Sequence, residues 1–456
     1  MASGRPVSGK MKIIGQHIAV LGAGESGESA ARLLHEEGAR VTVLDSGEPE
    51  KLREKIERLN ALGITVIAGP SADLDQGLYD LGIISPGIDP TTALVRNFRS
   101  RAIPLVGELE LAYVLCGQPV IAVTGTNGKT TTTQLIETML KGGGVKTVAC
   151  GNIGPAFSAK AREGRSMDVV TVEVSSFQLE EIKTFRPKVA VWLGFAPDHL
   201  ARYPSMLAYH DAKARIFENQ TSEDWAVVNF RDQLPPLKAR RVTFSAYTSG
   251  GDFDLRNGMI HFRGEPVLRM SDINLRGSHN AENFMAALGA GFAWGLDFTR
   301  MREPLCSYKA LPHRCELIRT LDGVDYVNDS KATNLDSMEK ALAGEDRTVV
   351  LIAGGKDKGF EFDSVLDLVA QKCRCAVLLG EMAGRIERLW SKRIACVNAG
   401  RSLERAVHTA RSHARPGDIV LFSPGTSSFD MFRNYADRGN QFRALVQSLT
   451  PTNAQP

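Results

Sequence analysis

Short apolar runs alternate with helical patterns at the start of the chain. The run HIAVL ends at a glycine turn, Gly22-x-Gly24-x-x-Gly27, and a stretch with apolar residues at helical spacing follows it. Two further apolar runs, Val41–Leu44 and Leu81–Ile84, have the pattern of buried strands. Strands that alternate with helices predict a parallel sheet, and the glycine turn makes this a Rossmann-like half.

The middle of the chain opens with a strand, a glycine-rich loop and a helix in direct succession. All three are found in AVTGTNGKTTTTQLIETML, which begins at Ala122. Further strand-like runs lie near 169–176 and 189–195, and Met206–Glu218 has a helical pattern. Residues 240–275 carry short apolar pieces broken by Gly, Asp and Arg, which predicts small antiparallel strands or loops.

The last part of the chain again alternates strand-like and helical stretches. Its strand-like runs lie near 347–353, 376–380, 394–398 and 418–423, which predicts a second doubly wound unit. The expected fold class is therefore α/β with three domains. These are a Rossmann-like N-terminal domain over residues 1–106, a central α/β domain around the glycine-rich loop over 107–308, and a Rossmann-like C-terminal domain over 309–456.

Composition and charge narrow the class of protein. Of the 456 residues, 43% are hydrophobic and 23% charged, so each domain can bury a core. The formal net charge of +3 gives no sign of a nucleic-acid or membrane-surface partner, and no apolar run reaches the length of a membrane span. The N-terminus lacks the apolar middle of a signal peptide. We therefore expect a cytoplasmic protein that binds small molecules, with neither nucleic acid nor membrane as a partner.

The seven cysteines are scattered, and none of them forms a CxxC pair. An odd count without that spacing argues against a disulfide framework or a zinc site and fits a reducing compartment. Cys373 and Cys375 are expected to be two half-buried thiols at the entry to a strand.

The glycine-rich loop has the pattern of a phosphate-binding loop. Gly128-Lys129-Thr130 matches the end of the Walker A motif, while Val123 stands where its first glycine would be and Gly125 anchors a shortened loop. Successive backbone amides at a helix start form an anion site, Lys129 adds positive charge, and the Thr130 hydroxyl can bind Mg²⁺. The alternative is a plain glycine turn with a solvated lysine.

Other polar residues follow apolar strands. Glu173 ends the run VVTVE, where an acid could hold the metal of a bound nucleotide; the alternative is an edge-strand glutamate that faces water. Asp198, His199 and Lys213 stay unassigned on spacing alone, because a lone lysine on an amphipathic helix is usually solvated.

Further candidates lie on a helix and in three loops. Asn280 and Asn283 are one helical turn apart, which fits a hydrogen-bonding face and equally a helix cap beside a surface residue. The polar loops NDSKATN, GGKDKG and SPGTSSFD each follow a predicted strand of the third domain. Because ligands of open α/β sheets bind beyond the carboxyl ends of strands, these loops predict a binding site.

Taken together, these stretches resemble the Mur ligase family, the ATP-dependent amide-forming enzymes of peptidoglycan assembly. The resemblance runs from about residue 15 to residue 447 through TGTNGKTTT, EVSSFQLE, DHLARYP, HNAEN, HRCE, NDSKATN, GGKDKG and SPGTSSFD. Within the family, Ser85-Pro86-Gly87-Ile88, GELELA and SPGTSSFDMFRNYADRG point to addition of D-glutamate to UDP-N-acetylmuramoyl-L-alanine. The resemblance implies a P-loop-like ATPase in the central domain and an active site between the domains. It also implies an acyl phosphate, a tetrahedral intermediate, release of ADP and phosphate, two Mg²⁺ ions, and a monomer.

The resemblance also implies roles for individual residues. The ATP phosphates would be bound by Gly125, Thr126, Asn127, Gly128, Lys129, Thr130 and Thr131. The adenosine would be bound by Asn280, Asn283, Arg314 and Asp329. One Mg²⁺ would bind Thr130 and Glu173, and the second His199 and a carbamylated Lys213, with Lys331 near the γ-phosphate. D-Glutamate would contact Thr333, Lys358, Ser428 and Phe429. The UDP-linked substrate would contact Gly24, Glu25, Ser26, Asp45, Ser85, Gly87 and Asn152.

Some observations leave alternatives open. The glycine turn with Asp45 by itself would favour an NAD enzyme, although the same amides can hold the pyrophosphate of a UDP-sugar. A folylpolyglutamate-synthase-like ligase would share the central loop, and a nucleotide-binding scaffold would need no catalysis. Gly194 and Ala196 stand where relatives often carry Asn and Thr, so the strand beside the second metal could be reorganised. The sequence does not settle the chirality of the glutamate.

Overall fold

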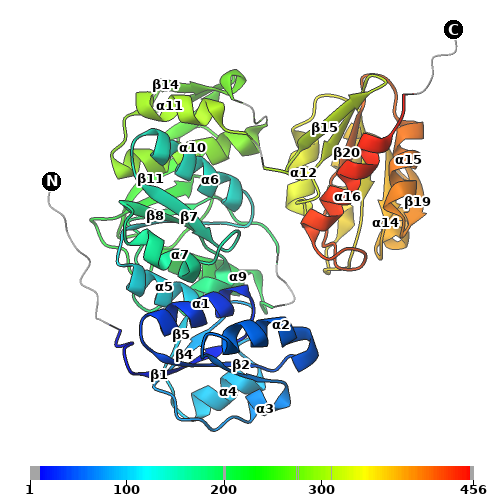
Figure 1. The fold of residues 1–456 in the computed structure, drawn as a ribbon. Helices are drawn as coiled ribbons and strands as arrows, with labels where there is room; N and C mark the ends of the chain where they lie inside the picture. The colour runs from blue at the N-terminus through cyan, green and yellow to red at the C-terminus, as the bar shows by residue number, and fades with distance from the viewer. Residues whose placement is uncertain (1–10, 199–201, 274, 276, 310, 452–456) are drawn as a thin grey trace. The chain divides into compact units, whose positions relative to one another are not determined.

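A computed structural model describes residues 11–198, 202–273, 275, 277–309 and 311–451. These residues form a five-stranded, a nine-stranded and a six-stranded sheet, each with helices packed on it (Figure 1). The α/β class with three domains is thereby confirmed. By contacts the chain divides into two compact units, of which the second holds the six-stranded sheet together with Ala196–Met206 and Arg269–Ala281. The exact domain boundaries remain predictions.

The first sheet is parallel throughout, in the order β3-β2-β1-β4-β5. Its central strand carries Ile18 and Val20, both fully buried, because helices cover the two faces. The strands are β1 His17–Leu21, β2 Arg40–Asp45, β3 Thr65–Ala68, β4 Leu81–Ile84 and β5 Leu105–Gly107. The helices are α1 Glu25–Glu36, α2 Pro49–Asn60, α3 Pro70–Asp73 and α4 Ala93–Ser100.

The second sheet has the order β14-β13-β12-β11-β10-β9-β6-β8-β7. Its parallel part contains β6 Val120–Thr124, β7 Thr147–Gly151, β8 Val169–Glu173, β9 Val189–Trp192, β10 Trp225–Asn229 and β11 Arg240–Ser245. Beyond β11, this sheet continues as β12 Phe253–Arg256, β13 Met259–Phe262 and β14 Glu265–Arg269. The expectation of small antiparallel strands over 240–275 is confirmed for the pair β12 and β13, but it is wrong for β11, which pairs parallel with both β10 and β12.

The helices of the central domain agree with the expected pattern, with one shortened element. The helix expected over Met206–Glu218 is α-helical only to Ala214 and continues as a 3-10 turn, Arg215–Phe217. The set is α5 Glu108–Cys116, α6 Lys129–Gly142, α7 Phe157–Gly164, α8 Ser176–Leu179, α9 Met206–Ala214, α10 Ser278–Trp294 and α11 Phe298–Ser307.

The third sheet has the order β15-β16-β20-β17-β18-β19 and is parallel except for β15, which pairs antiparallel with β16. All four expected runs are strands, and β15 is an edge strand that the pattern did not predict. The strands are β15 Glu316–Leu321, β16 Val324–Asn328, β17 Val349–Ala353, β18 Cys373–Leu379, β19 Ala395–Gly400 and β20 Ile419–Phe422. The α-helices are α12 Leu335–Ala343, α13 Leu366–Lys372, α14 Ala383–Trp390, α15 Leu403–His413 and α16 Tyr435–Ser448.

Cys373 and Cys375 lie in β18 as expected, but both are buried rather than half-buried. Burial raises the pKa of both thiols, that of Cys373 to about 12. In the described part of the chain, no helix has the length and apolar character needed to cross a bilayer.

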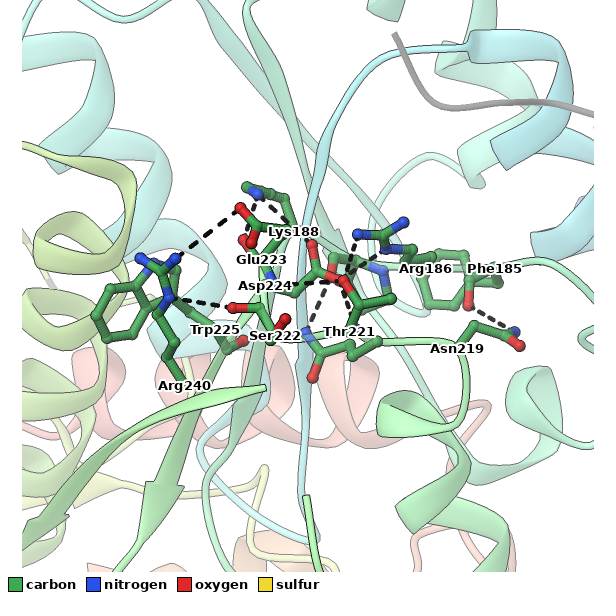
Figure 2. Close-up of polar contacts among 12 residues, drawn as sticks. Phe185, Arg186, Lys188, Asn219, Thr221, Ser222, Glu223, Asp224, Trp225 and Arg240 are labelled. Atoms are coloured by element: carbon green, nitrogen blue, oxygen red, sulfur yellow. Dashed lines mark hydrogen bonds and ion pairs between the residues drawn. The ribbon is translucent and has the colours of Figure 1, made fainter. Parts of the chain in front are cut away.

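A polar cluster joins the amino ends of β9 and β10, at the edge of the sheet away from the carboxyl ends of its parallel strands (Figure 2). The buried Asp224 carboxylate accepts from the Arg186 Nε at 2.7 Å and the Thr221 amide at 2.8 Å. The Lys188 ammonium lies 3.6 Å from the same carboxylate. The cluster stabilises this edge of the sheet and is remote from the glycine-rich loop.

Candidate functional site

The glycine-rich loop joins the carboxyl end of β6 to the start of α6, which begins at Lys129. Gly125 and Gly128 have φ values of 142° and 82°, a region that favours glycine because it has no Cβ. The Lys129 Nζ donates to the Gly125 oxygen at 3.0 Å and to the Thr126 oxygen at 2.9 Å. The predicted strand, loop and helix are confirmed, and the alternative of a lysine pointing into solvent is wrong.

The first turn of α6 offers backbone amides beside this lysine. The first amides of an α-helix have no partner within the helix, and the helix dipole places partial positive charge there. Thr130 and Thr131, in that turn, are buried. The loop and helix start together therefore have the chemistry of an anion site.

Glu173 lies on the strand next to the loop. Its strand β8 is between β6 and β7, and Glu173 is in register with Val123 of β6. The side chain is buried, so the alternative of an edge-strand glutamate in water is wrong. Asn152 donates to the Glu173 Oε1 at 2.9 Å, a contact that the sequence did not suggest.

Lys213 approaches the same loop from α9. The residue is only 1% exposed, and its Nζ donates to the Gly125 oxygen at 3.0 Å. The Nζ is also 4.8 Å from the centre of the Tyr209 ring, whose hydroxyl is 3.5 Å from the Thr126 Oγ1. The alternative of a solvated lysine is therefore wrong, and Lys129 and Lys213 converge on one carbonyl. His199 lies outside the described residues.

The two asparagines of α10 are both buried, so a surface position for either is wrong. Asn283 accepts from the Thr132 Oγ1 of α6 at 3.2 Å, which ties α10 to the helix that follows the loop. Asn280 lies 3.0 Å from the His279 Nε2, and burial lowers the pKa of His279 to about 4.

These residues suit a divalent cation in chemistry. The Thr130 hydroxyl and Glu173 carboxylate are the hard oxygen donors that Mg²⁺ prefers. No group of three or more His, Cys, Asp or Glu side chains in the described ranges could form a metal site by itself. A cation here would therefore depend on oxygens of its nucleotide as well, as is usual for Mg²⁺.

In the first domain, Asp45 organises the glycine turn. Its carboxylate accepts from the Ala23 amide at 2.6 Å and the Gly47 amide at 2.8 Å. The Lys55 Nζ donates to the Ala23 oxygen at 2.9 Å, and the Ser85 Oγ donates to the Gly22 oxygen at 3.3 Å. Gly24 is the N-cap of α1, Glu25 and Ser26 lie in its first turn, and Gly87 is exposed in the turn after β4.

In the third domain, Asp329 follows β16 and is buried. Its carboxylate accepts from the Ser423 Oγ at 2.8 Å and from the Cys315 amide at 3.2 Å. Burial raises the pKa of Asp329 to about 7, and the positive charge of Arg314 opposes that rise. The Lys331 Nζ lies 3.8 Å from the centre of the Tyr435 ring.

Lys358 already binds a carboxylate. Its Nζ donates to the Asp198 Oδ1 at 2.6 Å, and Asn334 donates to the Asp198 Oδ2 at 3.2 Å. Asn334 also caps α12 by accepting from the Ser337 amide. Thr333, next to Asn334, is half-buried. The sequence reasoning missed Asn334, although an asparagine just before a helix is a recognised cap signal.

The loop after β20 holds the last two predicted residues. Ser428 is buried and its carbonyl accepts from the Met431 and Phe432 amides, whereas Phe429 is 66% exposed. The loop pairs with the loop after β17, because the Lys356 amide donates to the Ser427 oxygen at 2.9 Å.

Family models cover most of the chain. The MurD-like N-terminal domain of Mur ligases matches residues 16–107, the Mur ligase middle domain 123–291, and the glutamate ligase domain of Mur ligases 313–425. This chain belongs to the Mur ligase family, and it is a ligase.

Individual relatives with similar sequences narrow the choice of ligase within the family. The chain is 40% identical to the UDP-N-acetylmuramoylalanine–D-glutamate ligase of Pelotomaculum thermopropionicum, over 95% of this chain and 97% of that protein. It is 39% identical to the ligase of the same name from Geobacter metallireducens, over 96% and 99%.

Solved structures share the fold. UDP-N-acetylmuramate-alanine ligase from Thermotoga maritima matches with a TM-score of 0.62 at 20% identity, over 95% of this chain and 99% of that one. MurF ligase from the same organism, solved in complex with ADP, matches with a TM-score of 0.58 at 15% identity, over 96% of both chains. At these identities the likeness supports the fold alone.

Proposed function

We propose that this chain joins D-glutamate to UDP-N-acetylmuramoyl-L-alanine and converts ATP to ADP and phosphate. The observation that carries the proposal is the convergence of Lys129, Lys213 and the start of α6 on one loop, beside the buried Glu173. The names of the relatives at 38–40% identity supply the substrates. We further propose that it acts as a monomer in the cytoplasm.

The proposed reaction has two steps. The alanine carboxylate attacks the γ-phosphorus of ATP, the bond to ADP breaks, and an acyl phosphate forms. The glutamate amine then attacks the acyl carbon, and the tetrahedral intermediate collapses with loss of phosphate and a proton. Lys129 and the α6 amides would hold the phosphates in line, since such transfers depend mainly on positioning and charge neutralisation.

The charge on the triphosphate calls for cations. Thr130 and Glu173 would hold one Mg²⁺. His199 and a carbamylated Lys213 would hold a second. Such ions would neutralise the negative charge that develops during phosphate transfer. Asn152 supports the first site because its bond fixes one oxygen of Glu173. Lys213 supports the second site because it is buried at the loop, where its Nζ contacts the Gly125 oxygen.

The remaining roles follow the family resemblance. Lys358, Thr333, Ser428 and Phe429 would bind D-glutamate, with the Lys358 ammonium as the positive charge that attracts a glutamate carboxylate. Asn280, Asn283, Arg314 and Asp329 would bind the adenosine, and Lys331 the γ-phosphate. Gly24, Glu25, Ser26, Asp45, Ser85, Gly87 and Asn152 would serve the UDP-linked substrate.

The test is phosphate release by the purified chain with ATP, UDP-N-acetylmuramoyl-L-alanine and glutamate, each omitted in turn. We expect release only with all three, and with D- but not L-glutamate. Lys129→Ala should lower kcat at least about a hundredfold while the fold persists. Lys141→Ala is the matched control, because Lys141 lies on the same helix in an ion pair with Glu137. Release without an amino acid, or near-normal turnover by Lys129→Ala, would refute the proposal.

A further inference from the structure

Arg438 is a buried guanidinium in the first turn of α16. It is 1% exposed and is among the largest fully buried side chains of the described residues. Its Nε donates to the Ser330 Oγ at 3.0 Å, one Nη to the Ser330 oxygen at 2.7 Å, and the other to the Thr426 oxygen at 3.1 Å. Three separate nitrogens therefore bind three acceptors.

These acceptors lie in two different loops. Ser330 stands between Asp329 and Lys331 after β16, and Thr426 stands two residues before Ser428 after β20. The two strands are neighbours in the sheet, so their loops lie at the same edge. The guanidinium is thus a direct bridge between the loop that carries Lys331 and the loop that carries Ser428.

A third loop is joined to this bridge. The Thr426 Oγ1 donates to the Lys356 oxygen at 2.5 Å, and the Lys356 amide donates to the Ser427 oxygen. Lys356 belongs to the loop after β17, and the same loop carries Lys358. Strand β17 pairs with β20 on the side of β20 that faces away from β16. One arginine therefore supports the loops of three adjacent strands.

The bridge is a buried charged group, whereas an apolar side chain would be enough to pack the two loops together. All three acceptors are neutral, and the described residues place no carboxylate within ion-pair distance of this guanidinium. Burial lowers the pKa of Arg438 to about 9, and the negative charges of Asp430 and Asp329 oppose that fall. A buried charge without a direct ion pair opposes folding, and an apolar side chain would avoid that cost. The planar fork of donors supplies what an apolar residue cannot, which is a fixed distance between two loops.

We propose that Arg438 is a positioning residue that holds the loops of Lys331, Lys358 and Ser428 in one arrangement for phosphate and glutamate. The roles of those three residues rest on the proposed function. Arg438 is buried behind the loops and acts through them. Its loss would let the loops move independently, and small misplacements of catalytic groups are costly.

The test compares Arg438→Lys with Arg319→Lys. Arg319 is a matched control because its Nη1 also donates to two main-chain oxygens, those of Gln447 and Leu449, at the other end of α16. Arg438→Lys keeps the charge and loses the fork. We expect kcat per folded molecule to fall about tenfold and the KM for glutamate to rise about tenfold. The KM for UDP-N-acetylmuramoyl-L-alanine should not change, nor should any constant of Arg319→Lys.

A second measurement does not depend on the reaction. Amide hydrogen exchange of residues 329–333 and 426–429 should become at least about tenfold faster in Arg438→Lys and stay unchanged in Arg319→Lys. If Arg438→Lys does not fold, Ser330→Ala removes one of the three acceptors and should show the same changes at smaller size. Unchanged exchange in these segments, or unchanged kinetic constants per folded molecule, overturns the proposal. Failure of the unmodified chain to ligate glutamate would refute the proposed function and leave the exchange result to decide on Arg438.

Discussion

Individual side chains of this protein are held in states that water would not favour. Lys213 is buried against a carbonyl, Asp329 is buried with two neutral donors, and Arg438 is buried among neutral acceptors. Such groups are costly to folding and cluster where a protein needs chemistry. Replacing such a group should therefore raise stability or leave it unchanged while function is lost.

Asp329→Asn should stabilise the protein above neutral pH. The pKa of Asp329 rises from its ordinary 3.8 to about 7 on folding, so the folded state binds a proton that the unfolded state releases. This favours folding below pH 3.8, and the advantage is lost as pH rises toward about 7. An asparagine has no charge to bury and can keep both hydrogen bonds.

We expect Asp329→Asn to raise Tm at pH 8 by about 5 °C relative to the unmodified protein and to raise Tm at pH 4.5 by about a quarter of that amount. Calorimetry across this range measures the difference. Affinity for ATP should fall, as read by isothermal titration. An equal Tm difference at both pH values would contradict the assignment of the shift to Asp329.

Lys213→Ala should abolish ligation, and short carboxylic acids such as acetate should restore part of it. The physical reason is that a carbamate is an anionic oxygen donor, which a small carboxylate can replace in the space left by the side chain. Lys213→Arg keeps a positive charge but cannot become a carbamate, so it should be inactive and not rescued. Full activity of untreated Lys213→Ala would exclude the carbamate.

At the element scale, strands and helices follow the sequence pattern closely where apolar residues are periodic. The run Leu81–Ile84 is a strand with the expected bounds, because both faces of that sheet are buried. The edge strand β15 was missed because its sequence, ELIRTL, mixes charges with apolar residues at an exposed edge.

Site residues were predictable only where a local motif names them. Lys129 follows from the spacing of glycines, and its place beside the loop needed no tertiary information. The convergence of Lys213 with that loop, the Asp198–Lys358 pair and the Arg438 bridge join segments far apart in the chain. Local sequence propensity does not specify contacts between distant segments. These contacts form only when the sheets and helices pack, so they could not be predicted from the sequence pattern.

Asp224→Ala should destabilise the central sheet without affecting catalysis. Loss of the carboxylate leaves the Thr221 amide and the Arg186 guanidinium without their shared acceptor (Figure 2). We expect roughly 2–3 kcal/mol lower free energy of unfolding by urea titration. Glu223→Ala is the control, since that side chain is exposed and lies 3.9 Å from the Arg240 guanidinium, and the expected change is within about 0.5 kcal/mol. A kcat changed by Asp224→Ala would place the cluster in the catalytic machinery instead.

In the whole molecule, each sheet belongs to one domain, but one hydrophobic core is shared by the first and central domains. Leu33 of the first domain packs in one apolar cluster with Leu109, Phe157 and other residues of the central domain. Ion pairs of Arg162 with Glu36 and Arg165 with Glu37 support the same contact. The apolar clusters on the two faces of the six-stranded sheet, by contrast, contain only residues of the third domain.

A fragment of residues 309–456 should therefore fold alone, and a fragment of residues 1–106 should not. The fragment of residues 309–456 keeps both of its hydrophobic cores whole. The fragment of residues 1–106 would expose Leu33 and lose the residues of α5 that pack in its cores. Circular dichroism and urea titration should show a cooperative transition for 309–456 only. A cooperative transition of similar midpoint for 1–106 would show that the shared core is dispensable.

Burial of the thiols has a consequence for inhibitor discovery. In six cysteines, those at 116, 150, 315, 373, 375 and 396, burial raises the thiol pKa and so suppresses the reactive thiolate at neutral pH. Acrylamide or chloroacetamide fragments would alkylate these positions slowly in the native protein. An irreversible compound aimed at one of these six positions would therefore react slowly through sulfur, so electrophiles that react with amines or hydroxyls are the better choice there.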